Sequence, residues 1–232
     1  MPETLAEHGR GGDEDWAAHL ERERRRYEDG EARLPDAADA DARQRQLTRL
    51  GNAAGGAGLT LLMQGRPGEA GEWFRRAASR YRESFADAPP ESWGRPLGAM
   101  KALVLAGDRP GAEGAARWAL AGGAADAPSA VGRYAAAVAL LVLGNDELAR
   151  PHADAIRIRD DFPHDVGDAL AYIAARDIVG YAAAIRSVLA SFEARDEYLE
   201  DLPVADTALV LQALARERGL DVPLSSRLLP PA

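Results

Sequence analysis

Apolar residues recur along this chain at intervals of three and four positions, which is the spacing of a helix that buries one face. The pattern continues over several turns in several segments, and no segment of useful length alternates as a half-buried strand would. The four clearest stripes are Trp93, Leu97, Met100 and Val104; Val131, Tyr134, Ala135, Val138 and Val142; Tyr181, Ile185, Val188, Leu189 and Phe192; and Val204, Ala208, Leu211 and Ala215. We therefore expect an all-α fold.

Two more helices are expected before these. The first would begin at Asp13, whose carboxylate can cap the free amides of a first turn, and end at Gly30. The second would run over about residues 40–64. Residues 1–12 are polar and contain glycine, which predicts a flexible arm in front of a single helical domain over residues 13–232.

The second of these helices contains the glycine-rich stretch GNAAGGAG at residues 51–58. A loop that binds phosphate would need a strand before it and, in the usual form, a Lys-Ser or Lys-Thr pair at the start of the next helix, and neither is present. Glycine and alanine on a helix face also allow a second helix to approach closely, and this is the interpretation that we adopt.

The segments between helices share a short motif. A turn residue is followed five positions later by alanine, with an apolar helix before the pair and an alanine-rich helix after it. The four pairs are Gly65 and Ala70, Gly107 and Ala112, Gly144 and Ala149, and Asp177 and Ala182. A unit of helix, tight turn and helix cannot bury its apolar stripe alone, so neighbouring units must stack around a shared core. The spacing predicts an array of antiparallel helical hairpins.

The small, apolar, turn and packing positions of the first unit are occupied by Gly58, Leu61, Gly65, Ala70, Phe74 and Ala77. This set resembles the tetratricopeptide repeat, and a weaker match covers about residues 47–195. Later units have other residues at these positions. Met100, Ala137 and Leu170 stand at the place of Gly58, Ala116 and Ala153 at that of Phe74, and Asp177 at that of the turn glycine. The resemblance implies an α-solenoid that presents a binding surface.

Composition and charge narrow the function. Hydrophobic residues make up 47% of the chain, with alanine and leucine dominant, and the net charge is −9. Most of that charge lies in residues 145–221, which hold 8 basic and 16 acidic side chains. An acidic surface repels nucleic-acid phosphates and attracts a basic partner. Because the chain has no cysteine, no apolar leader and no run of about 18 apolar residues, we expect a cytoplasmic protein without membrane contact.

The last quarter of the chain carries a second resemblance. The segment LPVADTALVLQALARERGLDVPLSSRLLP, residues 202–230, places Leu-Pro before a terminal helix, Arg-Glu-Arg-Gly at its end and an extended strip after it. Together with RDIVGYAAAIRSVL, this tail resembles the all-helical immunity proteins of bacterial polymorphic toxin systems, in the family numbered forty-nine. The resemblance implies a protein that neutralises a partner toxin by binding it, without catalytic residues.

One segment gathers side chains that could bind a metal ion, namely His152, Asp154, Asp160, Asp161, His164, Asp165 and Asp168. The His164-Asp165 pair is similar to a feature of metal-dependent phosphohydrolases, but those enzymes use several separated ligands and this chain has only four histidines. Helical packing of His152, which lies four residues from both Leu148 and Ile156, and capping by Asp165 of a helix that begins at Val166, explain the same residues. For nucleophilic catalysis there is no candidate either, because no serine lies in a Gly-x-Ser-x-Gly motif. From both arguments together we expect no catalytic, cofactor-binding or metal-binding residue.

We therefore expect a non-enzymatic helical repeat protein that binds another protein, which would be a basic toxin domain if the resemblance of the tail holds. The acidic residues expected to face that partner are Asp160, Asp161, Glu193, Asp196, Glu197, Glu200 and Asp201. Two alternatives remain: a general scaffold or regulatory adaptor with the same fold, and a metal-dependent hydrolase that uses His152 and His164.

Overall fold

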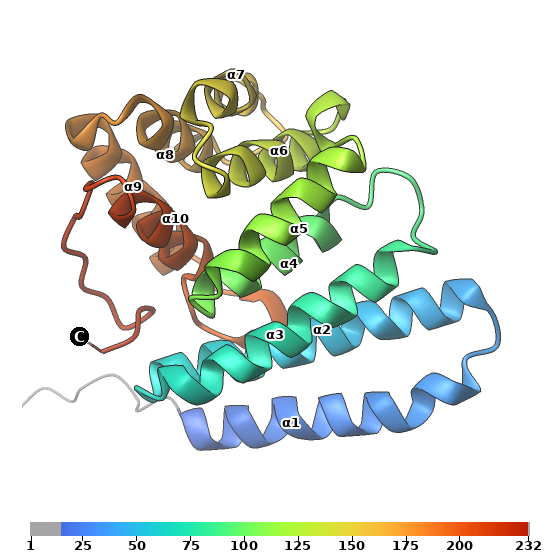
Figure 1. The fold of residues 1–232 in the computed structure, drawn as a ribbon. Coiled ribbons are helices and arrows are strands. Elements are labelled where there is room, and N and C mark those ends of the chain that lie inside the picture. Colours follow the sequence, from blue (N-terminus) through green and yellow to red (C-terminus); the bar gives the residue numbers. More distant parts are fainter. Residues whose placement is uncertain (1–14, 232) are drawn as a thin grey trace, which may run out of the picture.

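The computed structural model describes residues 15–231, and within this part of the chain every regular element is a helix (Figure 1). Its α-helices are α1 (Trp16–Arg33), α2 (Ala40–Met63), α3 (Pro67–Phe85), α4 (Gly94–Leu105), α5 (Arg109–Ala121), α6 (Ala130–Val142), α7 (Asp146–Arg157), α8 (His164–Ala175), α9 (Ile178–Glu193) and α10 (Asp206–Arg216). Its short 3-10 helices are η1 (Leu34–Asp36), η2 (Ala124–Asp126) and η3 (Leu199–Asp201). The all-α prediction is confirmed.

The N-terminal cap of α1 is Asp15. Its side chain accepts a hydrogen bond from the amide of Ala18 (2.9 Å), which satisfies one of the free amides of the first turn. The predicted cap Asp13 and the predicted arm over residues 1–12 lie outside the described residues.

The predicted end of the first helix at Gly30 is wrong, because α1 continues to Arg33. Gly30 is buried inside the helix, and a Cβ at this position would lie 2.7 Å from Leu50 Cδ2 of α2. The glycine therefore serves the close approach of α1 to α2 and does not stop the helix.

The glycine-rich stretch lies inside α2, which ends one residue before the predicted limit. A Cβ at Gly51 would lie 2.7 Å from Tyr81 Cε1, and a Cβ at Gly58 would lie 2.7 Å from Phe74 Cδ1. Both aromatic side chains belong to α3. The interpretation of this stretch as a surface for close helix packing is confirmed at these two glycines.

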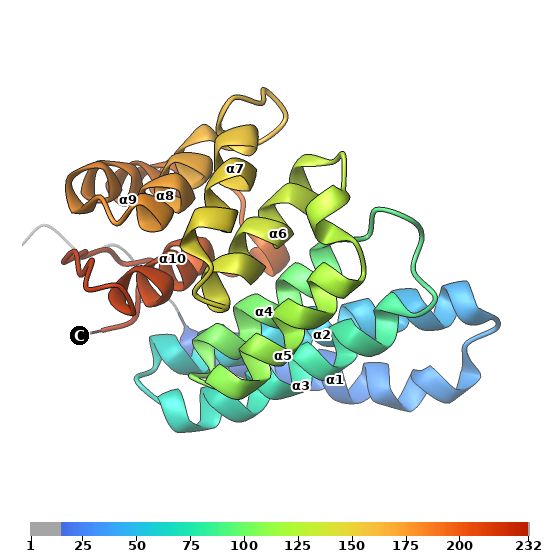
Figure 2. The ribbon, with the colours of Figure 1, turned by 45° about the horizontal axis from the view of Figure 1, so that its top comes forward.

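The helices from α2 to α9 form consecutive hairpins (Figures 1 and 2). Within the hairpins α2 packs against α3, α4 against α5, α6 against α7, and α8 against α9. Each hairpin also contacts the next, through α3 with α4, α5 with α6, and α7 with α8. The helix α1 packs on α2 at the N-terminal end.

The first three hairpin turns share one geometry. Each ends its first helix with a glycine of positive φ, which is 70° at Gly65, 65° at Gly107 and 74° at Gly144. The glycine amide donates to the carbonyl three residues earlier, and the following amide donates to the carbonyl five residues earlier, as from Arg66 to Leu61 (2.9 Å). This pair of bonds is the Schellman motif, in which the left-handed residue is usually glycine.

The fourth turn has the same geometry, but it lies one residue earlier than the alignment of the four turn motifs with one another predicts. The residue of positive φ is Arg176 (54°), whose amide donates to the carbonyl of Ile173 (3.1 Å), and the Asp177 amide donates to that of Tyr172 (3.0 Å). Asp177 is the N-terminal cap of α9. Its alignment with the turn glycines is therefore wrong.

The corrected register changes which residue fills the small position of the fourth unit. Ala70, Ala112 and Ala149 are buried, and Tyr181 at the equivalent position is also fully buried. The predicted equivalent, Ala182, is only partly buried. A search for a repeated alanine misaligns this unit because the buried position holds a large ring there.

The predicted apolar stripes face the interior with one exception. Val131, in the first turn of α6, is 40% exposed, so this stripe begins at Tyr134. Val104, at the end of α4, is partly buried.

The last helix joins the second and last hairpins, because α10 packs against α4, α8 and α9. The chain then returns beside it as an extended strip. The Ala205 amide donates to the carbonyl of Leu228 (2.9 Å), and Gln212 Nε2 donates to that of Val222 (2.6 Å). The terminal helix and the strip after it are present as predicted.

Candidate functional site

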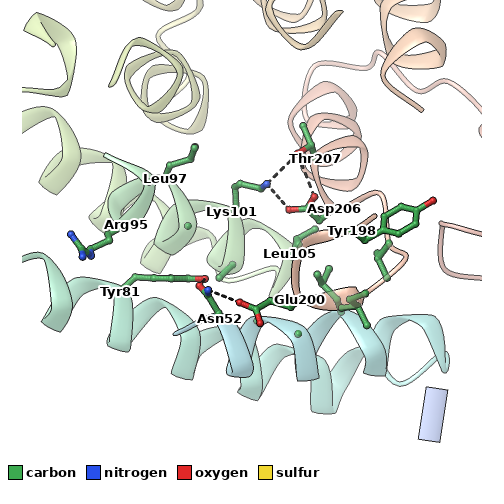
Figure 3. A pocket seen from close by; sticks show the side chains of 18 of the residues that line it. Asn52, Tyr81, Arg95, Leu97, Lys101, Leu105, Tyr198, Glu200, Asp206 and Thr207 are labelled. Carbon is green, nitrogen blue, oxygen red and sulfur yellow. Dashed lines mark hydrogen bonds and ion pairs between the residues drawn. The ribbon is translucent and has the colours of Figure 1, made fainter. Parts of the chain in front are cut away.

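A cavity of about 660 Å³ lies between the first hairpins and the C-terminal part of the chain (Figure 3). The helix α4 forms one wall, where Arg95, Leu97, Lys101 and Leu105 line the cavity, and residues of α2 and α3 adjoin it. The connection from α9 to α10 and the first turn of α10 form the opposite side. A volume in this range fits a small molecule or a short peptide segment.

Two glycines position Tyr81 of α3 at the cavity. A Cβ at Gly51 of α2 would lie 2.7 Å from Tyr81 Cε1, and a Cβ at Gly98 of α4 would lie 2.9 Å from its Cε2. The ring fits between α2 and α4 because both positions lack a side chain. Gly55 of α2 also lines the cavity, but no atom lies within 4 Å of a Cβ added there. Its missing side chain therefore leaves open space in the wall that α2 forms.

Glu200 is the centre of a hydrogen-bonded chain at one edge of the cavity (Figure 3). The Tyr81 hydroxyl donates to Asn52 Oδ1 (2.9 Å), and Asn52 Nδ2 donates to Glu200 Oε1 (2.8 Å). Arg26 of α1 pairs with the other carboxylate oxygen. Burial alone would raise the pKa of Glu200, but the hydrogen bonds from Arg26 and Asn52 outweigh burial and lower it. Glu200 is therefore an ionised anchor between the α9–α10 connection and the first two helices.

Lys101 extends from α4 toward the start of α10 (Figure 3). Its Nζ lies 2.5 Å from Asp206 Oδ2 and 3.2 Å from Thr207 Oγ1. Burial would lower the pKa of Lys101, but the charge of Asp206, the hydrogen bond to its carboxylate and the neighbouring Tyr134 together outweigh burial and raise it. The ammonium is charged at neutral pH, so Lys101 is suited to binding an anion and poorly suited to acting as a nucleophilic amine.

Three other side chains at the cavity keep hydrogen-bond donors without acceptors. Arg95 Nε donates to Thr48 Oγ1 (3.0 Å), but Arg95 Nη1 is buried without a partner, and burial lowers the pKa of Arg95. The guanidinium of Arg195 lies 3.7 Å from the ring centre of Phe192 and forms no ion pair within residues 15–231. The Tyr134 hydroxyl is buried without a hydrogen-bond partner.

The structure brings the two predicted acidic segments to this same cavity. Asp160 and Asp161 directly precede Phe162 and Pro163, which line it. The acidic residues Asp196, Glu197 and Asp201 lie in the α9–α10 connection, between the lining residues Arg195, Tyr198, Glu200 and Leu202. Two segments that are separated in the sequence by α8 and α9 therefore border one site.

The seven predicted acidic residues differ in their contacts. Those that are exposed and form no ion pair in the described part of the chain are Asp160, Asp196, Glu197 and Asp201. Asp161 pairs with Arg159 (2.7 Å), and Glu193 accepts a hydrogen bond from Ser226 (2.6 Å). Glu200 differs from the others because its carboxylate is bound to Arg26 and Asn52.

The metal-ligand candidates are engaged in other contacts. Arg157 pairs with Asp154 (3.4 Å) and Asp168 (2.6 Å), and His164 Nε2 lies 2.9 Å from the carbonyl oxygen of Arg159. Among residues 15–231 no group of three or more His, Cys, Asp or Glu side chains is arranged to hold a metal ion.

Two details of this segment differ from the prediction. The helix α8 begins at His164, so Asp165 lies inside its first turn and is not the cap of a helix that begins at Val166, although it accepts a hydrogen bond from the Val166 amide (2.9 Å). His152 is partly buried, and burial lowers its pKa, which agrees with a packed helical histidine beside the fully buried Ile156. The difference is that its other expected neighbour, Leu148, is 62% exposed.

Sequence reasoning missed the residues at the centre of the cavity. Lys101, Tyr134 and Asp206 come from three different helices, and no local motif connects them. One signal was available, because Lys101 is the only lysine of the chain and interrupts the apolar segment GAMKALVL. A charged residue inside such a segment indicates a buried partner or a ligand.

Comparisons of the chain with family models, curated proteins and solved structures found no match. In the described part of the chain, no helix has the length and apolar character that crossing a bilayer requires. The function must therefore be inferred from the site itself.

Proposed function

We propose that this chain is a non-enzymatic binding protein with a tetratricopeptide-like array of hairpins, and that it binds a basic surface of another protein at the edge of the cavity. We call the exposed carboxylates at this edge the acidic rim, which consists of Asp160, Asp161, Asp196, Glu197 and Asp201. The observation that carries the proposal is the convergence of two acidic segments on one cavity, with most of their carboxylates unpaired.

Unpaired like charges at one site are unfavourable for the isolated protein, because they repel one another. Many other carboxylates of the chain are paired, such as Glu69 with Arg66 (2.7 Å) and Asp154 with Arg150 (2.8 Å). Lysine and arginine side chains of a partner would neutralise the acidic rim, and its field would speed their encounter.

The repetition of the hairpins supports the finer part of this proposal. Four turns share the Schellman geometry, and the position five residues after each left-handed residue is buried. Stacked units of this kind present extended surfaces that bind other proteins.

The chemistry of the cavity favours binding over catalysis. Its two lining carboxylates, Glu200 and Asp206, are both bound to cations, and the low pKa of Glu200 makes it a poor general base. Lys101 is held as an ammonium.

In the structure α10 is followed by an extended strip, and this succession of elements is the one on which the resemblance to immunity proteins rests. In this more specific form of the proposal, the partner is a basic toxin domain and binding neutralises it. A toxin gene directly upstream of this one would support the specific form.

The test compares two charge variants as affinity baits in extracts of the native host. The rim variant D160N/D196N/E197Q/D201N removes four unpaired carboxylates. The control variant D36N/E72Q/D87N/E147Q removes four exposed carboxylates that also form no ion pair in the described part of the chain but belong to neither of the two segments that border the cavity. Captured proteins are identified by mass spectrometry, and binding is then measured with purified components.

We expect the wild type and the control variant to capture the same partner, and the rim variant to lose it. Equal capture by both variants would refute the role of the acidic rim. Capture of many unrelated proteins would favour the general scaffold over a dedicated immunity protein.

A further inference from the structure

The charges at the centre of the cavity do not balance. Arg195 is close enough to Lys101 to lower its pKa by repulsion, and Asp206 is the carboxylate that lies against Lys101. The other lining carboxylate, Glu200, is already paired with Arg26. One positive charge of the Lys101, Arg195 and Asp206 group is therefore left without a counter-ion in the described part of the chain.

Two donors beside this charge lack acceptors. An ammonium has three N–H groups, and Lys101 directs two toward Asp206 and Thr207, so the third is available. The Tyr134 side chain is 7% exposed and lines the cavity near Lys101, and its hydroxyl lies beside Thr207 but outside hydrogen-bond geometry. Burial raises the pKa of Tyr134, so the hydroxyl keeps its proton and can donate it to a hydrogen bond. Burying a hydroxyl without a partner costs stability, and a bound acceptor would remove that cost.

The walls around these donors are largely apolar. Leu97 and Leu105 line the cavity from α4, Phe162 and Val166 from the region of α8, and Phe192 from α9. A volume of about 660 Å³ exceeds what a small inorganic ion needs, so the space suits an organic ligand.

We propose that the cavity binds a molecule with an apolar body and a single carboxylate, which lies between Lys101, Tyr134 and Arg195. A carboxylate matches the unpaired guanidinium of Arg195 and the two donors beside it, and Asp206 and the acidic rim would repel it less than a phosphate near charge −2. The apolar body then lies against the leucine and phenylalanine side chains. This proposal does not depend on the proposed protein partner, because the ligand is expected to bind to the chain alone.

The test is calorimetric titration of the purified full chain with octanoate and with octanamide, which differ in charge but hardly in shape. A second pair of probes is an acetylated apolar tripeptide with a free and with an amidated C-terminus. We expect each carboxylate to bind at least about tenfold more tightly than its amide. Tighter binding of the tripeptide identifies a peptide C-terminus as the natural source, and tighter binding of octanoate identifies a free organic acid.

Two variants locate the carboxylate. Y134F removes only a hydroxyl that has no partner in the free protein, so it should preserve or raise stability while weakening the binding of the preferred carboxylate about fivefold. R195Q removes an exposed cation and should weaken it by a similar factor. R186Q is the matched control, because Arg186 is an exposed arginine of α9 that forms no ion pair in the described part of the chain and does not line the cavity.

The proposal is overturned if each carboxylate binds no better than its amide, or if none of the four probes binds. It is also overturned if Y134F and R195Q bind the carboxylate as tightly as R186Q does. Neither failure would affect the proposal for the acidic rim, which is measured with the captured protein partner.

Discussion

Lys101 and Asp206, which are 105 positions apart in the sequence, meet at 2.5 Å and join α4 to the first residue of α10. Their side chains are 18% and 30% exposed, so the pair is intermediate between a surface and a buried ion pair. Replacing Lys101 by methionine leaves the Asp206 carboxylate without its cation. We expect K101M to lower the free energy of unfolding by about 1–3 kcal/mol, measured by urea denaturation.

The double variant K101M/D206L completes this experiment. It removes both charges, so it should be more stable than K101M alone. If the losses caused by K101M and by D206L simply added up in the double variant, the pair would not be coupled and α4 would not be held to α10 in this way.

Gly167 tests the packing of neighbouring hairpins. A Cβ there would lie 2.8 Å from the backbone nitrogen and Cα of Arg157, so α8 approaches α7 at a position that has no room for a side chain. We expect G167A to destabilise the protein by about 1–3 kcal/mol. G114A is the matched control, because no atom lies within 4 Å of an added Cβ in α5, and alanine should add about 0.5–1 kcal/mol through helix propensity. Equal effects of the two substitutions on the urea midpoint would contradict this packing.

Arg176 tests the corrected alignment of the fourth turn. Both R176G and R176A remove the ion pair with Asp146 (3.1 Å), but only glycine relieves the left-handed backbone. R176G should therefore be more stable than R176A by about 1 kcal/mol, and G144A should lose a similar amount at the third turn. Thermal and urea unfolding of the three variants measure these differences. A more stable R176A would mean that the residue of positive φ lies elsewhere.

Glu200 predicts a pH dependence of stability. Its pKa is lowered in the folded state, so its contribution is complete above the unfolded value of about 4.3 and is lost as the pH falls through the folded value. We expect E200Q to be less stable than the wild type by about 1–2 kcal/mol at neutral pH. The difference should shrink below about pH 4, where the wild-type carboxylate also becomes neutral. A gap that stays constant or widens in acid would contradict the ionised anchor.

Local signals explain how much of the fold could be predicted. The turns at Gly65, Gly107 and Gly144 were found because a left-handed residue after an apolar helix is usually glycine, which is a property of a few adjacent residues. The same rule failed at the fourth turn, where Arg176 adopts this conformation without a local signal. It also failed at Gly30, where the absence of a side chain serves contact with another helix.

The candidate site could be predicted only in part for the same reason. Charge composition indicated the acidic segments, because charge is counted without knowledge of the fold. The cavity between them depends on α10 packing against α4, and no periodicity in either helix specifies that long-range contact. Tyr134 was assigned to the core by its period, and the lack of a partner for its hydroxyl became visible only with its neighbours in place.

The most direct measurement of the central claim is the association rate constant with the captured partner as a function of ionic strength. If the acidic rim attracts a basic surface, the rate constant of the wild type falls at least about tenfold between about 0.05 and 0.5 M salt. The control variant D36N/E72Q/D87N/E147Q should follow the wild type closely. The rim variant D160N/D196N/E197Q/D201N should associate slowly at low salt and depend little on ionic strength. Identical rates and salt dependence for the rim and control variants would contradict the account.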